Sequence, residues 1–396
     1  MSDPVRVLEL RSVRGTGGGP EKTILHGAAL ADSGRVAVTV CYLRDPADPC
    51  FEIGARAAAL RLDYVELHER HSLDASVWPA LVSLVRDRRI DIVHAHDYKT
   101  DLLALALGEA TAAIPLSTVH GWIYDSWRER RIYYPVDKWL LRWFPRVIAV
   151  SSRIRSTLVE AGVRGDRITT VLNGIDADVF RRDNAITIAA REELGLKPSE
   201  IVIGAVGRLE PVKRFDVLLD AFARVHERWR RARLIIVGEG GQRSALESRA
   251  SALGLTDACM FLGHRPDVIR LHHAFDVFVQ SSDSEGTPNA VLEAMALETA
   301  VVATNAGGTR DVLRHGKDGL IVPCGDVDAL AGAIDRTLTE DEARLGRIAA
   351  ARARVVDELS FERRTRAIES IYYNLVAARR TRACACGDVT GIVPER

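Results

Sequence analysis

The stretch from Gln280 to Ala303 reads QSSDSEGTPNAVLEAMALETAVVA. Apolar runs lie before it, at residues 277–279, and at its end, at residues 300–303, and each is typical of a buried strand. Thr287 is a suitable N-cap and Pro288 suits the first helical position, so we expect a helix over residues 288–297. A strand, a turn, a helix and a second strand in this order predict an α/β unit.

The turn of this unit combines groups that bind anions with groups that accept hydrogen bonds. The first helical turn has free backbone N–H groups and the positive end of the helix dipole, which suit a diphosphate. Glu285 precedes the helix, and Glu293 shares one helix face with Asn289, four residues earlier. Carboxylates suit the hydroxyl groups of a sugar or ribose. An ordinary strand–turn–helix unit with solvated glutamates is the alternative.

A second stretch, residues 201–213, has matching chemistry. Ile201–Val206 is an apolar run that predicts a buried strand, and it ends in Gly207 and Arg208. Lys213 follows five residues after Arg208, and an amphipathic helix follows Lys213. Both cations therefore lie at the carboxyl end of a strand, where open α/β sheets bind ligands.

Together the two stretches resemble the retaining glycosyltransferases of family 4, which have the GT-B fold. The matching residues are Gly207-Arg208 with Lys213, and Glu285 with Glu293. Segments 171–176 (with Phe180), 235–240 and 261–265 extend the resemblance, which covers about residues 5–375. The fold class that it implies is α/β, with two Rossmann-like domains facing a central cleft and a C-terminal helix that crosses back to the first domain.

The resemblance also implies the domain boundaries. We expect an acceptor-binding domain over residues 1–185 and a domain that binds the nucleotide-sugar donor over residues 186–360. A helix over residues 361–380 would return to the first domain, and residues 381–396 would form a tail. The polar run at residues 181–184 is the expected linker.

The roles of individual residues follow from the same resemblance. His120, in the context Thr118-Val119-His120-Gly121, would contact the donor sugar and be needed for activity; a structural histidine at a strand end is the alternative. The expected catalytic residues are His120, Arg208, Lys213 and Glu285. The expected donor-binding residues are Gly18, Gly19, Gly207, Glu239, His264, Arg265, Gly286, Thr287, Pro288, Asn289, Ala290, Val291, Leu292 and Glu293.

The expected mechanism uses protein cations in place of a metal. Arg208, Lys213 and the helix N-terminus would neutralise the leaving diphosphate, Glu285 would hold donor-sugar hydroxyls, and Glu293 would hold the ribose. No carboxylate is clearly placed as a covalent nucleophile. We therefore expect transfer with retention by a front-face route, in which the donor phosphate helps to deprotonate the acceptor.

The metal motifs in the chain are weak. Asp176-Ala177-Asp178 spells the Asp-x-Asp of metal-dependent glycosyltransferases, but it lies in the interdomain segment. Cys384 and Cys386 lack the two-residue spacer of common zinc motifs. His94 and His96 share a face of a predicted strand, and packing and hydrogen bonding at the strand end are favoured over a metal site. We expect no metal and no cofactor, with a UDP- or GDP-linked sugar as co-substrate.

The glycine-rich loop at residues 14–22 raises one rival function. A nicotinamide-binding fingerprint needs Gly-x-Gly-x-x-Gly, but Pro20 stands where the third glycine belongs. A nicotinamide dehydrogenase is therefore the weakest rival. A sugar-nucleotide epimerase of the same architecture and a non-catalytic nucleotide-sugar-binding protein remain as alternatives.

Composition and charge bear on location and partners. The formal net charge of +0 does not indicate nucleic-acid binding, and the scattered cysteines are typical of reduced thiols. We expect a cytoplasmic protein, because the chain shows neither a signal peptide at its start nor an apolar run of about 20 residues.

The acceptor is the least determined partner. Residues 122–146 mix aromatic and basic side chains, a composition that suits an anionic membrane surface; a helix with its aromatic stripe packed inward is the alternative. The expected acceptor is a saccharide or a lipid-linked acceptor in cell-surface polysaccharide or glycolipid synthesis. A lipid-linked acceptor would bring a peripheral contact with the inner face of the membrane.

Overall fold

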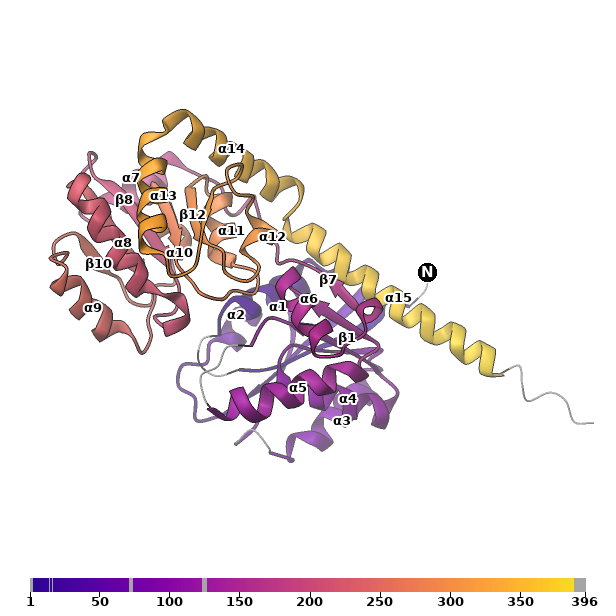
Figure 1. Cartoon of the computed structure of the whole chain (residues 1–396). Coiled ribbons are helices and arrows are strands. Elements are labelled where there is room, and N and C mark those ends of the chain that lie inside the picture. The colour runs from indigo at the N-terminus through magenta and orange to yellow at the C-terminus, as the bar shows by residue number, and fades with distance from the viewer. Residues whose placement is uncertain (1–2, 14, 16, 71–73, 123–126, 388–396) are drawn as a thin grey trace, which may run out of the picture. The chain divides into compact units, whose positions relative to one another are not determined.

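The computed structural model describes residues 3–13, 15, 17–70, 74–122 and 127–387 (Figure 1). The chain forms two compact units. Unit 1 comprises residues 1–150, 154–171 and 362–396, and unit 2 comprises residues 151–153 and 172–361. Residues 172–185, which the sequence analysis assigns to the first domain, thus make their contacts in unit 2.

Unit 1 is built on a seven-stranded parallel sheet with the order β3-β2-β1-β4-β5-β6-β7. Its strands are β1 (Val5–Ser12), β2 (Val36–Arg44), β3 (Asp63–His68), β4 (Ile92–Ala95), β5 (Ile114–Val119), β6 (Arg146–Ala149) and β7 (Ile168–Thr170). The strand order reverses between β1 and β4, so the carboxyl ends of these two neighbours form the switch point of the sheet.

The helices of unit 1 cover this sheet. They are α1 (Gly19–Leu30), α2 (Ile53–Ala59), α3 (Val77–Asp87), α4 (Tyr98–Thr111), α5 (Tyr134–Leu140), α6 (Ser152–Glu160) and α15 (Phe361–Gly387), with short turns η1 (Glu129–Tyr133), η2 (Leu141–Trp143) and η3 (Gly165–Arg167). The long yellow helix in Figure 1 is α15. It buries Ile368, Ile371, Tyr372 and Val376 against strand residues such as Val7, so the end of the chain completes the core of its first strands.

Unit 2 repeats the architecture with a six-stranded parallel sheet in the order β10-β9-β8-β11-β12-β13. Its strands are β8 (Ile201–Val206), β9 (Ala232–Val237), β10 (Cys259–Phe261), β11 (Val277–Gln280), β12 (Ala300–Thr304) and β13 (Leu320–Val322). Val277 and Val279 join one hydrophobic cluster and Phe278 joins another, because successive side chains of a strand point to opposite faces. Both faces of the sheet are therefore covered.

The helices of unit 2 are α7 (Asn184–Glu193), α8 (Phe215–Arg228), α9 (Arg243–Ala252), α10 (Val268–His273), α11 (Asn289–Ala296), α12 (Thr309–Val312), α13 (Val327–Thr339) and α14 (Asp341–Asp357), with a short turn η4 (Pro211–Lys213). The predicted α/β class with two parallel-sheet domains is confirmed. The predicted N-cap is wrong, because α11 begins at Asn289 and its N-cap is Pro288. Within the described ranges, no helix combines the length and the apolar character that a membrane span requires.

Candidate functional site

The predicted catalytic residues of unit 2 gather at the switch point of its sheet. β8 and β11 are hydrogen-bonded neighbours, and the strand order reverses between them. Gly207 and Arg208 follow β8, and the turn that contains Glu285 follows β11. Two segments far apart in the sequence thus meet at the edge of the sheet where open α/β proteins bind ligands.

The centre of this site is an ion pair between Lys213 and Glu285. Lys213 Nζ lies 2.6 Å from Glu285 Oε1, and the Ser282 hydroxyl donates to the same oxygen at 2.6 Å. Burial alone would raise the pKa of Glu285, but the Lys213 charge and hydrogen bonds from Lys213, Ser282 and Gln280 lower it below its usual value. Glu285 is therefore ionised near neutral pH, and its carboxylate can accept hydrogen bonds from a bound ligand as well as from Lys213 and Ser282.

Arg208 provides an uncommitted positive charge. Its side chain is exposed, and its guanidinium forms no hydrogen bond or ion pair with any residue that the structure describes. Since five N–H donors of a guanidinium match phosphate oxygens in geometry and charge, Arg208 is available to an anionic ligand.

The first turn of α11 supplies backbone donors. Val291 and Leu292 donate their N–H groups to Pro288 O at 3.1 and 3.2 Å, whereas Asn289 and Ala290 donate to no acceptor in the described part of the chain. The side chains of Val291 and Leu292 are buried in the core of unit 2. Of the predicted donor-binding residues in this helix, Asn289 and Ala290 therefore have backbone N–H groups available to an anion.

Asn173 holds the start of α11, a role that the sequence analysis missed. Its backbone N–H donates to Thr287 Oγ1 at 3.3 Å, and its side-chain amide donates to Asn289 Oδ1 at 3.0 Å. The Thr287 hydroxyl thus binds a segment outside the helix instead of capping it. A polar residue in an apolar run, Val171-Leu172-Asn173, is the signal that could have drawn attention to it.

A second missed support lies in the loop after β12. The Gly308 N–H donates to Glu285 O at 3.2 Å, and Gly307 has a φ of +51°. A Cβ atom at Gly307 would lie 1.9 Å from Glu285 O, so only glycine allows this approach. Two consecutive glycines in the loop that follows a buried strand are a signal that sequence reasoning could have used.

The remaining predicted donor-binding residues of unit 2 are spread over the same edge of the sheet. Glu239 follows β9 and pairs with Arg243 at 2.6 Å, while His264 and Arg265 follow β10. Arg265 binds Asp267 at 2.6 Å, and His264 is exposed. Glu293 is buried in α11, with its Oε2 3.5 Å from His272 Nε2. Their contacts with a donor stay predictions.

In unit 1, predicted residues also lie near the carboxyl edge of the sheet. His120 follows β5, and Gly18 and Gly19 lie where α1 begins. The Gly18 N–H donates to the carboxylate of Glu21, which forms an ion pair with Arg11. The N–H of Gly18 is therefore already engaged, and the binding of a donor by Gly18 and Gly19 stays a prediction.

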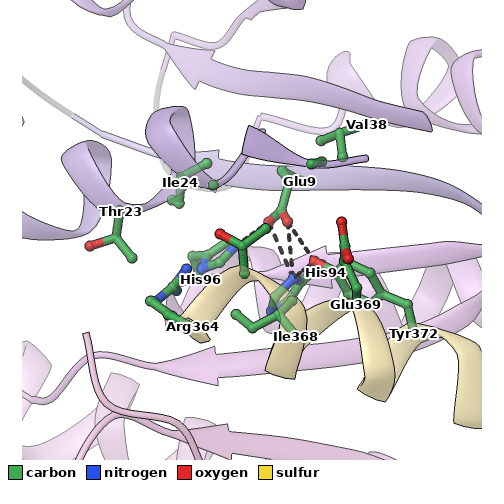
Figure 2. Close-up of a pocket in the computed structure, with 13 residues that line it drawn as sticks. Glu9, Thr23, Ile24, Val38, His94, His96, Arg364, Ile368, Glu369 and Tyr372 are labelled. Carbon is green, nitrogen blue, oxygen red and sulfur yellow. Dashed lines mark hydrogen bonds and ion pairs between the residues drawn. The ribbon is translucent and has the colours of Figure 1, made fainter. Parts of the chain in front are cut away.

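A buried polar network lies at the switch point of unit 1, and Figure 2 shows Glu9 at its centre. Glu9 accepts a hydrogen bond from Tyr372 of α15 at 2.7 Å, and it contacts both His94 and His96 of the β4 segment. Burial alone would raise the pKa of Glu9, but His94 and His96 hold it well below its usual range. His120 joins the network through His96, with 3.1 Å between His96 Nδ1 and His120 Nε2.

The same network is the metal candidate among the described residues. Glu9, His94 and His96 bring three ligand atoms within 4.8 Å of one another. Each of these atoms is hydrogen-bonded to another side chain of the network, as packing at the strand end predicts. In the Asp-x-Asp sequence, Asp176 accepts hydrogen bonds from the backbone N–H groups of Asp178 and Val179, both at 3.0 Å.

The aromatic side chains of the aromatic and basic stretch divide into two groups. Trp127, Trp139 and Trp143 are 65%, 50% and 64% exposed, whereas Tyr133 is partly buried and stacks on Tyr98, so only part of the stripe is packed inward. The partly buried Trp122 donates its indole N–H to Asp137 at 2.9 Å. Tyr124 of the predicted stretch lies outside the described residues.

In the comparisons with known proteins, a different family model matches most of each unit. Residues 17–179 match the model of Glycosyltransferase Family 4, and residues 187–354 match that of Glycosyl transferases group 1. A glycogen synthase of Mycobacterium tuberculosis is 30% identical over 306 residues, covering 74% of this chain and 70% of the relative. The chain belongs to glycosyltransferase family 4.

A further relative of this glycosyltransferase and a solved structure of another protein agree with this assignment. The UDP-Gal:alpha-D-GlcNAc-diphosphoundecaprenol alpha-1,3-galactosyltransferase of Escherichia coli is 28% identical, over 75% of this chain and 79% of the relative. The crystal structure of Anabaena HepE with UDP-glucose matches with a TM-score of 0.82 and 21% identity, covering 93% of this chain and 99% of the other. The predicted family, GT-B fold and enzyme class are thereby confirmed.

Proposed function

We propose that this glycosyltransferase moves a sugar with retention from a UDP- or GDP-linked donor to a saccharide or lipid-linked acceptor, without a metal or other cofactor. The observation that carries the proposal is the meeting of Lys213, Glu285 and Arg208 at the switch point of unit 2. Cations beside free N–H groups suit a diphosphate, and an ionised carboxylate beside them suits sugar hydroxyls.

The relatives favour a uridine nucleotide. The Escherichia coli relative is named for a UDP-linked galactose donor, and HepE has been solved with UDP and with UDP-glucose. We therefore place UDP-sugars first among the donors, with GDP-sugars as the alternative.

The proposed reaction is a front-face displacement. The bond between the anomeric carbon and the donor phosphate breaks, and the acceptor oxygen bonds to the same face of that carbon. The acceptor proton passes to the leaving phosphate. Arg208, Lys213 and the N-terminus of α11 would stabilise the charge that develops on the diphosphate, which is the part a divalent cation plays in other transferases.

The proposed acceptor is lipid-linked, in cell-surface polysaccharide or glycolipid synthesis. Exposed Trp127, Trp139 and Trp143 stand among exposed bases such as Arg128 and Arg131. Aromatic rings and bases on one surface suit the interface of an anionic membrane. The diphosphoundecaprenol in the name of the Escherichia coli relative supports the same class of acceptor.

A donor panel tests the proposal. UDP- and GDP-sugars are screened by thermal shift and for release of nucleoside diphosphate, with and without EDTA. We expect at least one nucleotide sugar to raise Tm and to turn over at the same rate in EDTA. Loss of turnover in EDTA with rescue by Mg²⁺ or Mn²⁺ would contradict metal independence.

The same panel separates the alternatives. An epimerised nucleotide sugar as the product, without transfer or hydrolysis, identifies an epimerase. Binding without any turnover, even with lipid-linked acceptors, identifies a non-catalytic nucleotide-sugar-binding protein.

A further inference from the structure

Three side chains that are linked by hydrogen bonds lie near the carboxyl ends of neighbouring strands in unit 1. Glu9 lies in β1, His96 follows β4, and His120 follows β5; β1, β4 and β5 are consecutive in the sheet. His96 Nε2 makes a short hydrogen bond with Glu9 Oε2, and His96 Nδ1 lies 3.1 Å from His120 Nε2. Figure 2 shows Glu9 and His96 side by side. Both ring nitrogens of His96 therefore form hydrogen bonds with the other two side chains, Glu9 and His120.

The direction of these hydrogen bonds follows from the charge of Glu9. The pKa of Glu9 is held well below its usual range by His94 and His96 despite its burial, so Glu9 is a carboxylate and only accepts. His96 Nε2 must then carry the hydrogen. Burial, followed by His94, lowers the pKa of His96 to about 4, so the ring is neutral near pH 7 and its Nδ1 must accept. The donor to Nδ1 is His120 Nε2.

The other nitrogen of His120 is consequently an acceptor. Burial and the nearby His96, Arg11 and Arg364 hold the pKa of His120 well below its usual value, so this ring is also neutral. With hydrogen on Nε2, the Nδ1 atom has a lone pair. Nδ1 has no hydrogen-bond partner among the residues that the structure describes.

We propose that Glu9 and His96 are positioning residues that fix His120 as its Nε2–H tautomer and so present Nδ1 as the acceptor for a substrate hydroxyl. This inference rests on the proposed function, in which His120 contacts the sugar. Glu9 and His96 touch no substrate; they act through His120, as a carboxylate orients a histidine in other relays.

Burial of the network argues against a purely structural role. Glu9 and His96 are 9% and 4% exposed, and Leu8 and Leu10 beside Glu9 are fully buried apolar residues. Apolar residues of similar volume would usually stabilise such a position at least as well as a buried charge. A fixed tautomer is a property that only hydrogen-bonding groups can provide.

The substitution Glu9→Gln tests the hydrogen-bonded relay from Glu9 through His96 to His120. Tyr372 Oη donates to Glu9 Oε1 at 2.7 Å, while His94 Nδ1 lies 3.2 Å from both carboxylate oxygens. The Tyr372 hydrogen bond keeps the amide oxygen of Gln at the Oε1 position and turns its NH₂ group toward His96. His96 Nε2 must then accept, His96 Nδ1 must donate, and His120 is driven to the Nδ1–H tautomer.

The measurement is a long-range ¹H–¹⁵N correlation spectrum of the full chain with labelled histidine, in which His120→Gln assigns the His120 signals. We expect the Nε2–H tautomer in the wild type and the Nδ1–H tautomer in Glu9→Gln. We expect kcat for transfer to fall roughly 10²- to 10⁴-fold, with a change in donor KM of less than about threefold.

His94→Gln is the matched control. His94 also contacts Glu9, but its Nε2 lies 2.7 Å from Thr118 Oγ1 rather than beside His120. We expect this variant to keep the Nε2–H tautomer of His120.

Three results would overturn the inference: an Nδ1–H or charged His120 in the wild type, an unchanged tautomer in folded Glu9→Gln, or a changed tautomer with unchanged kcat. The wild-type spectrum decides the first point even if Glu9→Gln fails to fold. If the wild type turns over no nucleotide sugar, the proposed function fails, and the spectra still decide whether the relay exists.

Discussion

At the scale of single residues, the site in unit 2 depends on a charge pair that a bound donor would share. Glu285 and Lys213 are mostly buried side chains that neutralise each other, while Arg208 is exposed and uncommitted. The two cations therefore differ in what their removal does to the free protein. We therefore expect Lys213 to act in stability as well as in binding, and Arg208 to act in binding alone.

We predict that Arg208→Ala and Lys213→Ala each lower kcat/KM for transfer by about 10²-fold or more, because each removes charge that stabilises the leaving diphosphate. Lys213→Ala should also lower the free energy of unfolding by about 1–3 kcal/mol, since it leaves Glu285 without its partner. Arg208→Ala should leave this free energy unchanged within about 0.5 kcal/mol. Steady-state kinetics and urea unfolding measure both effects.

Arg249→Ala is the control for these variants. Arg249 is an exposed arginine of α9 that pairs with Asp220 of α8 at 2.5 Å, and neither residue lies at a strand end. Its removal should change kcat/KM less than twofold. Wild-type kcat in folded Arg208→Ala and Lys213→Ala would show that the assignment of these cations to the phosphate is wrong.

At the scale of elements, the turn between β11 and α11 is held by the loop after β12. Gly308 N–H binds Glu285 O, and Gly307 approaches the same carbonyl. The position of Glu285 is thus set by a neighbouring strand's loop as well as by its own turn. A substitution that disturbs this contact should therefore affect the position of Glu285 without altering any side chain that is predicted to bind the donor.

We predict that Gly307→Ala destabilises unit 2 and weakens nucleotide-sugar binding, because the new Cβ would lie 1.9 Å from Glu285 O. Gly316→Ala is the matched control. Gly316 also has a positive φ, +76°, but a Cβ there meets nothing within 4 Å. Backbone strain of about 1 kcal/mol is common to both variants.

Gly307→Ala should therefore lose at least about 2 kcal/mol more stability than Gly316→Ala, a clash of the size that overpacking causes. It should also raise the Kd of the best donor about tenfold or more, which corresponds to about 1.4 kcal/mol. Equal unfolding curves and equal Kd values for the two variants would show that the loop after β12 does not hold the Glu285 turn.

At the scale of the whole molecule, unit 1 is made from both ends of the chain. α15 completes the core beside β1 and carries Tyr372 to Glu9. The same unit presents an aromatic–basic surface, which we define as Trp127, Arg128, Arg131, Trp139 and Trp143. All five side chains are exposed, so this surface is available to a partner.

We predict that the protein binds vesicles containing phosphatidylglycerol more tightly than neutral vesicles, as measured by co-sedimentation. Each base near an anionic surface contributes about 1 kcal/mol, so Arg128→Ser with Arg131→Ser should lower the anionic partition coefficient roughly 10- to 30-fold. Trp139→Ser with Trp143→Ser should lower binding to both kinds of vesicle. Leu345→Ser, an exposed apolar residue of α14 in unit 2, is the control.

Equal partitioning to neutral and anionic vesicles, unchanged in the arginine variant, would count against membrane contact. A soluble saccharide acceptor would then be favoured, and the assignment of the donor site would be unaffected.

The sequence by itself determined the class of fold and grouped the central residues of the candidate site in unit 2. Apolar runs such as Ile201–Val206 and Val277–Val279 are local patterns, and local patterns determine where strands form. Because the strands of such a sheet are parallel, polar residues that follow separate strands meet at one edge. Arg208, Lys213 and Glu285 could therefore be grouped from their positions after strands.

Only the tertiary structure decided which of these groups pair and which residues support them. Lys213 and Glu285 are 72 residues apart, and Glu9 and Tyr372 are 363 apart. The period of two in β1 puts Glu9 on the same face as Val5 and Val7, and this face is covered by a helix from the other end of the chain. Periodicity indicates on which face of the sheet a side chain lies. Packing between distant segments determines what covers that face. The relay from Glu9 to His120 therefore appears only in the folded chain.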